Sequence, residues 1–261
     1  EQMHIYLLRR AGIAKRLRCL RSLSSSVTQL ARRALRRAHP ELTDQVINAQ
    51  FLLNQYGIVP LKRLPETTDG LAAMHEFNIL TAVQPVIDAL EQLGVRHCIS
   101  GSVASSAYGI PRSTLDVDIA AELQLDQVDP LTARLASDYY LDEDMMRDAI
   151  TQRASFNLIH FETLLKIDIF VIGQESYSQE VLRRRRKDTL AEEPENIECH
   201  LASPEDVVLN KLRWFRLGGE TSEQQWRDIL GVLKVQAEAL DIPYLRQWAT
   251  ELEILDLLER A

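Results

Sequence analysis

The chain has little of what disulfide-rich, zinc-binding and membrane-spanning proteins require. Its 261 residues include only three cysteines, which are widely separated and odd in number: Cys19, Cys98 and Cys199. Such a set gives neither a disulfide framework nor zinc-ligand spacing, and it is typical of a reducing cytoplasm. The six histidines form no HxxxH or HxH pattern, so the sequence does not indicate a zinc centre. No apolar run reaches the roughly 18 residues of a membrane span, and we expect a soluble cytoplasmic protein with no membrane partner.

Acidic residues are almost absent from the first 40 positions. This segment carries ten Lys or Arg residues and one acid, Glu1, although the whole chain has a formal net charge of -8. Because the arginines continue into a helical pattern, we favour a folded basic module over a targeting signal. Two interpretations of its charge stay open: the helices bind tRNA or another RNA, or they dock on the acidic remainder of the same chain.

Composition and periodicity divide the chain into three predicted regions. Residues 1–70 form a basic N-terminal helical module, residues 71–175 alternate helices with strands, and residues 176–261 are mainly helical. A loop with two prolines at 58–70 marks the first boundary. The predicted fold class is therefore α+β, with a short mixed β-sheet and flanking helices between two helical regions.

Apolar spacing and capping residues place the individual elements. Helical spacing over 5–38 is interrupted near the serines at 22–26, which predicts two helices, and a further helix over 43–56 ends at Gly57. The other predicted helices cover 79–93, a short stretch from the Gly101-Ser102 turn to Tyr108, 131–137, 205–217, 222–239 and 243–260. The predicted strands cover 96–100, 114–121, 155–161 and 164–172, the last two as a hairpin.

Residues 101–118, GSVASSAYGIPRSTLDVD, place two aspartates one residue apart in a predicted strand. Side chains alternate along a strand, so Asp116 and Asp118 point the same way while their apolar neighbours point into the core. Two adjacent like charges repel and lose solvation, and we therefore expect a hard divalent cation between them, magnesium or alternatively manganese. A third strand aspartate, Asp168, would complete a cage for two cations, as phosphoryl transfer requires. The alternative is that the first two lie at a sheet surface and Asp168 pairs with Lys166 or an arginine.

Residues around this pair are suited to phosphate. The Gly101-Ser102 turn opens a helix, where backbone N–H groups and a hydroxyl can hold phosphates at the positive helix end. Ser102 can also cap that helix, a role compatible with phosphate binding. Arg112 either steers a triphosphate or forms a local salt bridge.

The order Gly101-Ser102, then Asp116-Val-Asp118, then a distal strand aspartate resembles the DNA polymerase beta-like nucleotidyltransferase superfamily, whose pattern is hG[GS]…DhDh…h[DE]h. The match covers residues 95–172; a serine precedes Gly101, and the spacing to Asp116 is long for the family. The resemblance implies magnesium-dependent transfer of a nucleoside monophosphate from an NTP, ATP among them, to an acceptor. It makes Asp116, Asp118 and Asp168 both catalytic and metal-binding.

The C-terminal part resembles the helical segment of abortive-infection (AbiEii-type) nucleotidyltransferase toxins. The matching residues are SPEDVVLNK ending at Lys211, then Arg216, then QWRDIL with Arg227 and Asp228. This branch implies that Lys211 and Arg227 contact the nucleotide, that a tRNA 3′ end is the acceptor, and that a cognate antitoxin is a partner. An Arg-Asp pair on a helix is as easily structural. The alternatives are an aminoglycoside- or protein-modifying nucleotidyltransferase and a catalytically silent RNA- or partner-binding module.

Overall fold

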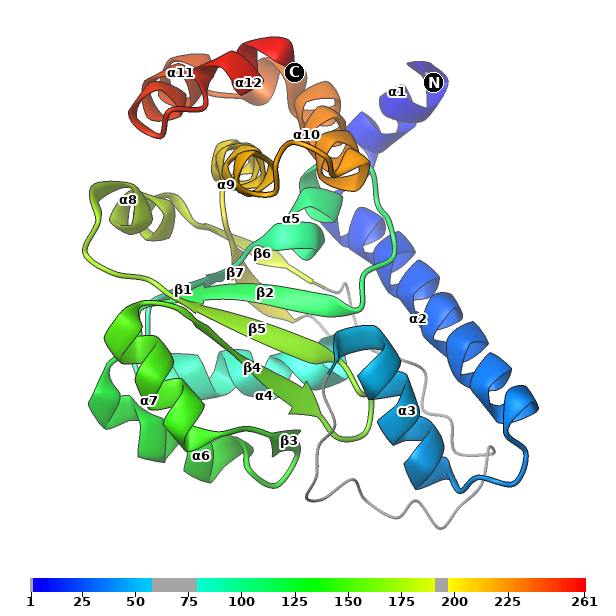
Figure 1. Cartoon of the computed structure of the whole chain (residues 1–261). Coiled ribbons are helices and arrows are strands. Elements are labelled where there is room, and N and C mark those ends of the chain that lie inside the picture. Colours follow the sequence, from blue (N-terminus) through cyan, green and yellow to red (C-terminus); the bar gives the residue numbers. More distant parts are fainter. Residues whose placement is uncertain (1, 58–78, 191–196) are drawn as a thin grey trace.

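The computed structural model describes residues 2–57, 79–190 and 197–261 and shows a mixed α+β fold built on a seven-stranded sheet (Figure 1). The strands are β1 (His97–Ile99), β2 (Asp116–Ala121), β3 (Tyr139–Tyr140), β4 (Ser155–His160), β5 (Lys166–Val171), β6 (Arg186–Thr189) and β7 (Glu198–Leu201). Their order in the sheet is β3-β4-β5-β2-β1-β7-β6. β2 pairs in parallel with β5 and β1 with β7, and the other neighbours are antiparallel. The predicted α+β class is confirmed; the predicted loop at 58–70 lies outside the described residues.

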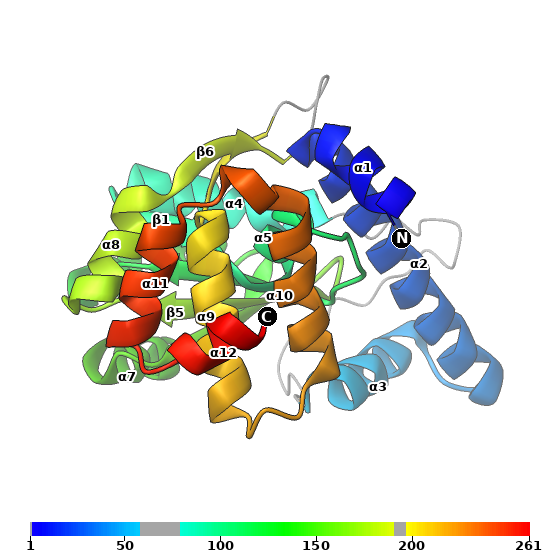
Figure 2. The same ribbon diagram turned by 90° about the horizontal axis from the view of Figure 1, so that it is seen from above.

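Helices cover both faces of this sheet (Figures 1 and 2). One face carries α4 (Ile79–Gln92), α6 (Val128–Leu135) and α7 (Glu143–Gln152). The other carries α5 (Gly101–Tyr108), α8 (Ser176–Arg184), α9 (Pro204–Leu217) and α10 (Glu223–Gln236), with α11 (Ile242–Glu251) and α12 (Leu255–Arg260) outside α9. Within the described ranges, none of the helices is both long enough and apolar enough to cross a membrane.

The N-terminal part of the described chain, before α4, forms the helices α1 (Gln2–Arg10), α2 (Ile13–Ala38) and α3 (Asp44–Tyr56). The prediction of a break near the serines at 22–26 is wrong, because α2 runs through them and the chain breaks at Gly12 instead. Ser24 is fully buried, and its hydroxyl accepts a hydrogen bond of 2.9 Å from the backbone N–H of Thr114. The small Ser24 side chain therefore allows α2 to approach the core closely at this point.

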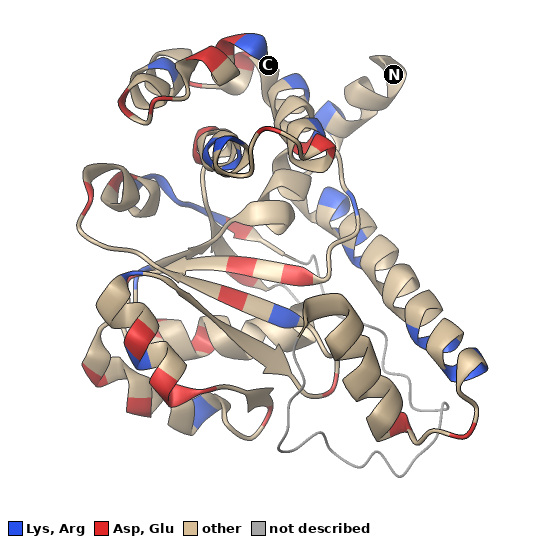
Figure 3. Ribbon diagram, viewed as in Figure 1, with Lys and Arg blue, Asp and Glu red and all other residues tan. Residues whose placement is uncertain are grey.

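Several of the N-terminal arginines bind within the chain. Arg9 donates to the Lys234 carbonyl at 2.7 and 3.1 Å, and the buried Arg16 donates to the carbonyls of Leu8 and Ala107 at 2.7 and 2.5 Å. The bonds to Lys234 and Ala107 join this segment to α10 and α5, and their acceptors are backbone carbonyls rather than acidic side chains. Figure 3 shows further basic positions on the last turns of α2.

Besides the two-residue β3, the strands β6 and β7 were not predicted. Both lie in the region expected to be mainly helical, and β7 joins the sheet beside β1, with Ile99 opposite Leu201. Four-residue segments carry too little alternation to identify a strand, and pairing with a neighbour decides the conformation. The segment predicted as one helix over 243–260 forms two, α11 and α12. The remaining predicted elements agree with the structure to within a few residues, including α3 with its Thr43 cap and the left-handed Gly57.

The packing of α2 predicts how it contributes to stability. Leu20 is 1% exposed and belongs to the main core, whereas Leu30 on the same helix is 65% exposed. Leu20→Ala should lower the free energy of unfolding by about 2–5 kcal/mol, and the matched change Leu30→Ala by less than about 0.5 kcal/mol. Urea unfolding measures both. Equal effects would show that α2 does not belong to the folding core.

Candidate active site

The pairing of β2 with β5 brings the three predicted aspartates to one face of the sheet. In this parallel register Asp118 lies directly opposite Asp168, and Asp116 lies opposite Lys166. The alternate residues of both strands are buried in the core. Figure 3 shows the acidic positions of the two strands side by side. The predicted alternation is therefore present, and it concentrates like charge on one face.

Asp118 lies against the first residue of α5. Gly101 has a φ of +55°, and a Cβ atom at this position would lie 1.6 Å from Oδ2 of Asp118. Only glycine therefore leaves room for the carboxylate at the start of this helix. Burial, followed by the charges of Asp116 and Asp168, raises the pKa of Asp118 to about 6 against the opposing effects of Lys211 and Lys166. The ionised form of Asp118 is therefore destabilised by burial and by the two neighbouring carboxylates.

Asp168 pairs with Lys166 on its own strand. Their charged atoms are 2.7 Å apart. This pairing is one of the alternatives that the sequence left open. Burial nevertheless raises the pKa of Asp168 above its usual value, with Lys166 opposing. The Tyr56 ring, at the end of α3, lies 5.6 Å from the Lys166 ammonium, and its hydroxyl donates to the Leu115 carbonyl at 2.6 Å. The N-terminal helices thus reach the edge of the acidic cluster.

Asp116 is oriented by a hydrogen bond from Thr114. The Thr114 hydroxyl donates to Oδ1 of Asp116 at 2.6 Å. Thr114 is itself fixed by Ser24 of α2. A chain of two hydrogen bonds therefore links α2 to the first aspartate.

A basic group faces these acids and is organised by Asp228 of α10. Arg112 binds both oxygens of Asp228 at 2.9 and 3.0 Å, and Lys211 binds one of them at 2.8 Å. Burial alone would raise the pKa of Asp228, but Arg112 and Lys211 hold it below its usual value. Arg112 also donates to the Ser102 hydroxyl at 2.6 Å. Ser102 lies within the first turn of α5, and the N-cap position is that of Ser100, whose side chain makes no capping hydrogen bond.

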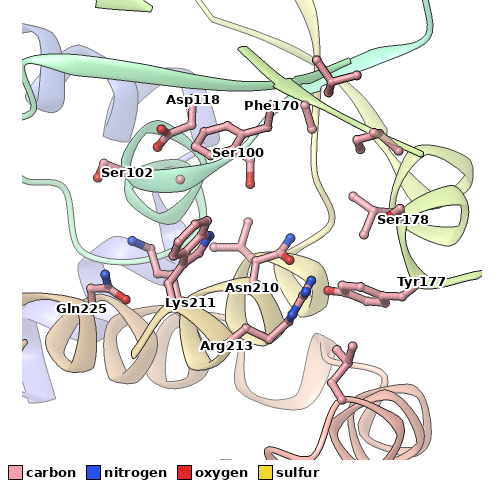
Figure 4. Close-up of a pocket in the computed structure, with 18 of the residues that line it drawn as sticks. Ser100, Ser102, Asp118, Phe170, Tyr177, Ser178, Asn210, Lys211, Arg213 and Gln225 are labelled. Carbon is pink, nitrogen blue, oxygen red and sulfur yellow. The ribbon is translucent and has the colours of Figure 1, made fainter. Parts of the chain in front are cut away.

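Acidic residues, Asp116 and Asp118, and basic residues, Arg112 and Lys211, line one cavity of about 960 Å³. Its walls include six of the predicted site residues, namely Gly101, Ser102, Arg112, Asp116, Asp118 and Lys211. Figure 4 shows Asp118 and Ser102 on one side of this space and Lys211 on the other. The cavity size is within the range of ordinary small-molecule sites.

Two predicted residues lie outside this cavity lining. Asp168 is held beside it by Lys166. Arg227 is 77% exposed on α10 and pairs with Glu223, which is 83% exposed, at 2.7 Å. Because successive residues of a helix lie about 100° apart, the inward position of Asp228 turns Arg227 to the outside.

Other lining residues were missed from the sequence. The cavity lining also includes Tyr177, Asn210, Arg213 and Trp214, none of which was predicted as a site residue. Trp214 is 53% exposed and contacts Phe170 edge to face, with ring centroids 6.1 Å apart. The spacing of Asn210, Lys211 and Trp214 on one helix was the available signal, because residues three or four apart share a helix face.

Comparison with known proteins gives only distant similarity. No protein-family model matches the chain, and no curated protein sequence matches it significantly. The antibiotic-resistance factor ANT(2'')-Ia superimposes with a TM-score of 0.45 and 11% identity over 69% of this chain and 96% of its own. The lincomycin-bound lincosamide antibiotic adenylyltransferase LnuA gives 0.40 and 13% over 59% and 96%. An antigenic nucleotidyltransferase-like protein from Paracoccidioides brasiliensis gives 0.39 and 19% over 66% and 89%. None of these similarities assigns a substrate or a residue role to this chain.

The raised pKa of Asp118 predicts a stabilising substitution. The folded pKa is about 6 against 3.8 for the ordinary group, so between these values the folded protein binds more protons than the unfolded chain. This carboxyl therefore favours folding at low pH, and the contribution is lost as the pH rises through 6. Without divalent cations at pH 7, Asp118→Asn should raise the free energy of unfolding by up to about 3 kcal/mol, and the gain should vanish near pH 4.

Urea unfolding in a chelating buffer at both pH values measures this difference. Asp126→Asn, at an exposed position, is the matched control and should change little. A variant Asp118→Asn that is less stable than the original at pH 7 would contradict the strained carboxylate.

Proposed function

We propose that the chain is a divalent-cation-dependent nucleotidyltransferase, which moves a nucleoside monophosphate from an NTP to an acceptor hydroxyl and releases pyrophosphate. The observation that carries this proposal is that an acidic pair, Asp116 and Asp118, and a basic pair, Arg112 and Lys211, face the same cavity. Carboxylates bind the cation that accompanies a triphosphate, and basic side chains bind the phosphates themselves. Phosphoryl transfer depends on both kinds of charge stabilisation.

The donor atoms of the acidic pair fit magnesium or manganese. Asp116 and Asp118 offer only oxygen ligands, and the raised pKa of Asp118 reflects like charges that a cation would relieve. When bound, the cation supplies neutralisation of the triphosphate and a lower pKa for the attacking hydroxyl. In the proposed two-cation site, Asp168 would be the further ligand, which requires it to exchange its bond with Lys166.

The chain's own residues then have distinct roles. The backbone N–H groups at Gly101 and Ser102 lie at the start of α5, where a phosphate is favoured. Lys211 and Arg112 neutralise phosphate oxygens across the cavity. Asp168 supplies a carboxylate that accepts the proton of the acceptor hydroxyl.

For the acceptor, the toxin-like C-terminal motif favours an RNA 3′ end, with a toxin role and a cognate antitoxin. The exposed Trp214 beside Phe170 supports an acceptor or donor with a planar ring, because a base stacks on such a side chain. A small molecule such as an aminoglycoside, or a protein hydroxyl, is the competing acceptor.

Incubation with each labelled NTP, magnesium and separate cellular RNA, protein and small-molecule fractions tests the proposal. One NTP should label one fraction, and chelation of the metal should abolish labelling. Asp118→Asn should lower the rate by at least about 100-fold, as expected when a group that stabilises the transition state is lost. Since this variant is predicted to be folded and more stable, its inactivity would not reflect unfolding. No incorporation from any NTP would instead favour the catalytically silent module.

Substitution of Lys211 on α9 and of Arg227 on α10 tests which of these two basic residues binds the nucleotide. Lys211→Ala should lower kcat/KM for the NTP by about 10–100-fold, because a charge-assisted hydrogen bond to phosphate is lost. Asp228 would keep its two bonds from Arg112, so the protein should stay folded. Arg227→Ala, at a position where the charge is solvated, is the control and should change kcat/KM less than twofold. Equal losses would contradict the assignment of Lys211 as the phosphate contact.

A further inference from the structure

A second group of chemically active side chains lies away from the cavity. Glu91 of α4, His97 of β1 and His200 of β7 have ligand atoms that all lie within 4.8 Å of one another. Among the residues that the structure describes, no other group of three or more His, Cys, Asp or Glu side chains meets this limit. His97 pairs with Ala121 in the sheet, so it lies on the face opposite Asp118 and near α4.

The protonation of His97 is fixed by its surroundings. Its side chain is 3% exposed, and Nδ1 lies 3.0 Å from the Val95 carbonyl oxygen. Because a carbonyl only accepts hydrogen bonds, Nδ1 carries the proton and Nε2 carries a lone pair. This Nε2 is buried and has no hydrogen-bond partner among the described residues. Histidine ligands of metals are commonly oriented in this way, with the other ring nitrogen donating to a carbonyl.

His200 presents a second nitrogen of the same kind. Its Nδ1 is buried and also has no hydrogen-bond partner in the described part of the chain, and its ring meets that of His97 edge to face with centroids 5.9 Å apart. Buried polar atoms normally have partners, so an unpartnered nitrogen on each of two contacting imidazole rings calls for an explanation, and a shared cation would supply one. Burial lowers the pKa of both rings, which keeps them neutral.

The charges around the two rings allow a cation. Arg185 and Lys187 lower the pKa of His200, while Glu91 raises it. Lys187 is itself paired with Glu198 at 2.6 Å, and Arg185 donates to a backbone carbonyl at 3.3 Å. Glu91 is exposed and brings the negative charge that the two neutral rings lack.

We propose that Glu91, His97 and His200 bind a zinc ion whose fourth position is open to water. Two imidazole nitrogens and one carboxylate oxygen form a ligand set that zinc adopts when it keeps an exchangeable site. Magnesium prefers oxygen ligands, so this chemistry differs from that of the aspartate cavity. Zinc bonds are about 2.0–2.1 Å long, so the ligand atoms, which lie within 4.8 Å of one another, would have to close around the ion, and the exposed Glu91 side chain would have to rotate toward it. The ion ties the end of α4 to β1 and β7.

Titration of the chelator-treated full chain with Zn²⁺ tests this site, with excess Mg²⁺ present to occupy the aspartate cavity. Calorimetry should show one equivalent of Zn²⁺ bound and a higher melting temperature. His200→Ala and Glu91→Gln should each weaken binding by more than about 100-fold, since loss of an outer partner of a ligand already costs 10–100-fold. His39→Ala, a change at an exposed histidine, should bind as the original does.

Asp118→Asn separates the two sites, because it removes an aspartate ligand and leaves both histidines. Retained Zn²⁺ binding in this variant, together with its loss in His200→Ala, supports the histidine site. Co²⁺ in place of Zn²⁺ adds a visible spectrum that reports tetrahedral coordination. The proposal would be overturned if the original chain and His200→Ala bound Zn²⁺ with equal affinity. It would also be overturned if only Asp118→Asn lost the bound Zn²⁺. Both test variants avoid the buried His97, whose replacement could unfold the protein.

Discussion

The parallel pairing of β2 with β5 is the constraint on which the site depends. It sets Asp118 beside Asp168 on a partly buried face, where ionised carboxylates repel each other and lose hydration. A sheet stabilised for its own sake would place apolar or paired residues there. The neighbouring residues do not remove this repulsion. Gly101 leaves room for the Asp118 carboxylate, and Lys166 forms an ion pair with Asp168 alone.

Asp228 has the complementary function on the opposite wall. Arg112 and Lys211 would repel each other if they were held close together without an anion, and each would be attracted to the nearby aspartates. By binding both cations, the buried Asp228 fixes their positions on the side of α9 and α10. The ion pair therefore keeps acidic and basic walls apart, which leaves a cavity instead of a collapsed cluster of salt bridges. A buried pair of this kind serves geometry more than stability.

Local sequence patterns were sufficient for the parts of the site that depend on local geometry. The common direction of Asp116 and Asp118 follows from the two-residue period of a strand, and the Gly101 turn from the residues around it. The choice of Lys166 as the partner of Asp168, the role of Asp228 and the strands β6 and β7 depend on tertiary pairing. For these, the sequence offered alternatives of similar plausibility or too short a pattern, and only the register of distant segments selects among them.

The same distinction explains why the N-terminal helices could not be assigned from their charge. A run of arginines indicates an affinity for anions but not which anions, and the contacts between these helices and the acidic cluster are made by uncharged residues. Ser24 fixes Thr114, which orients Asp116, and Tyr56 lies beside Lys166. Both contacts are made by neutral side chains that no charge pattern would single out. A displacement of α2 or α3 would therefore disturb the acidic cluster directly, so the N-terminal helices support the geometry of the site whatever their arginines bind.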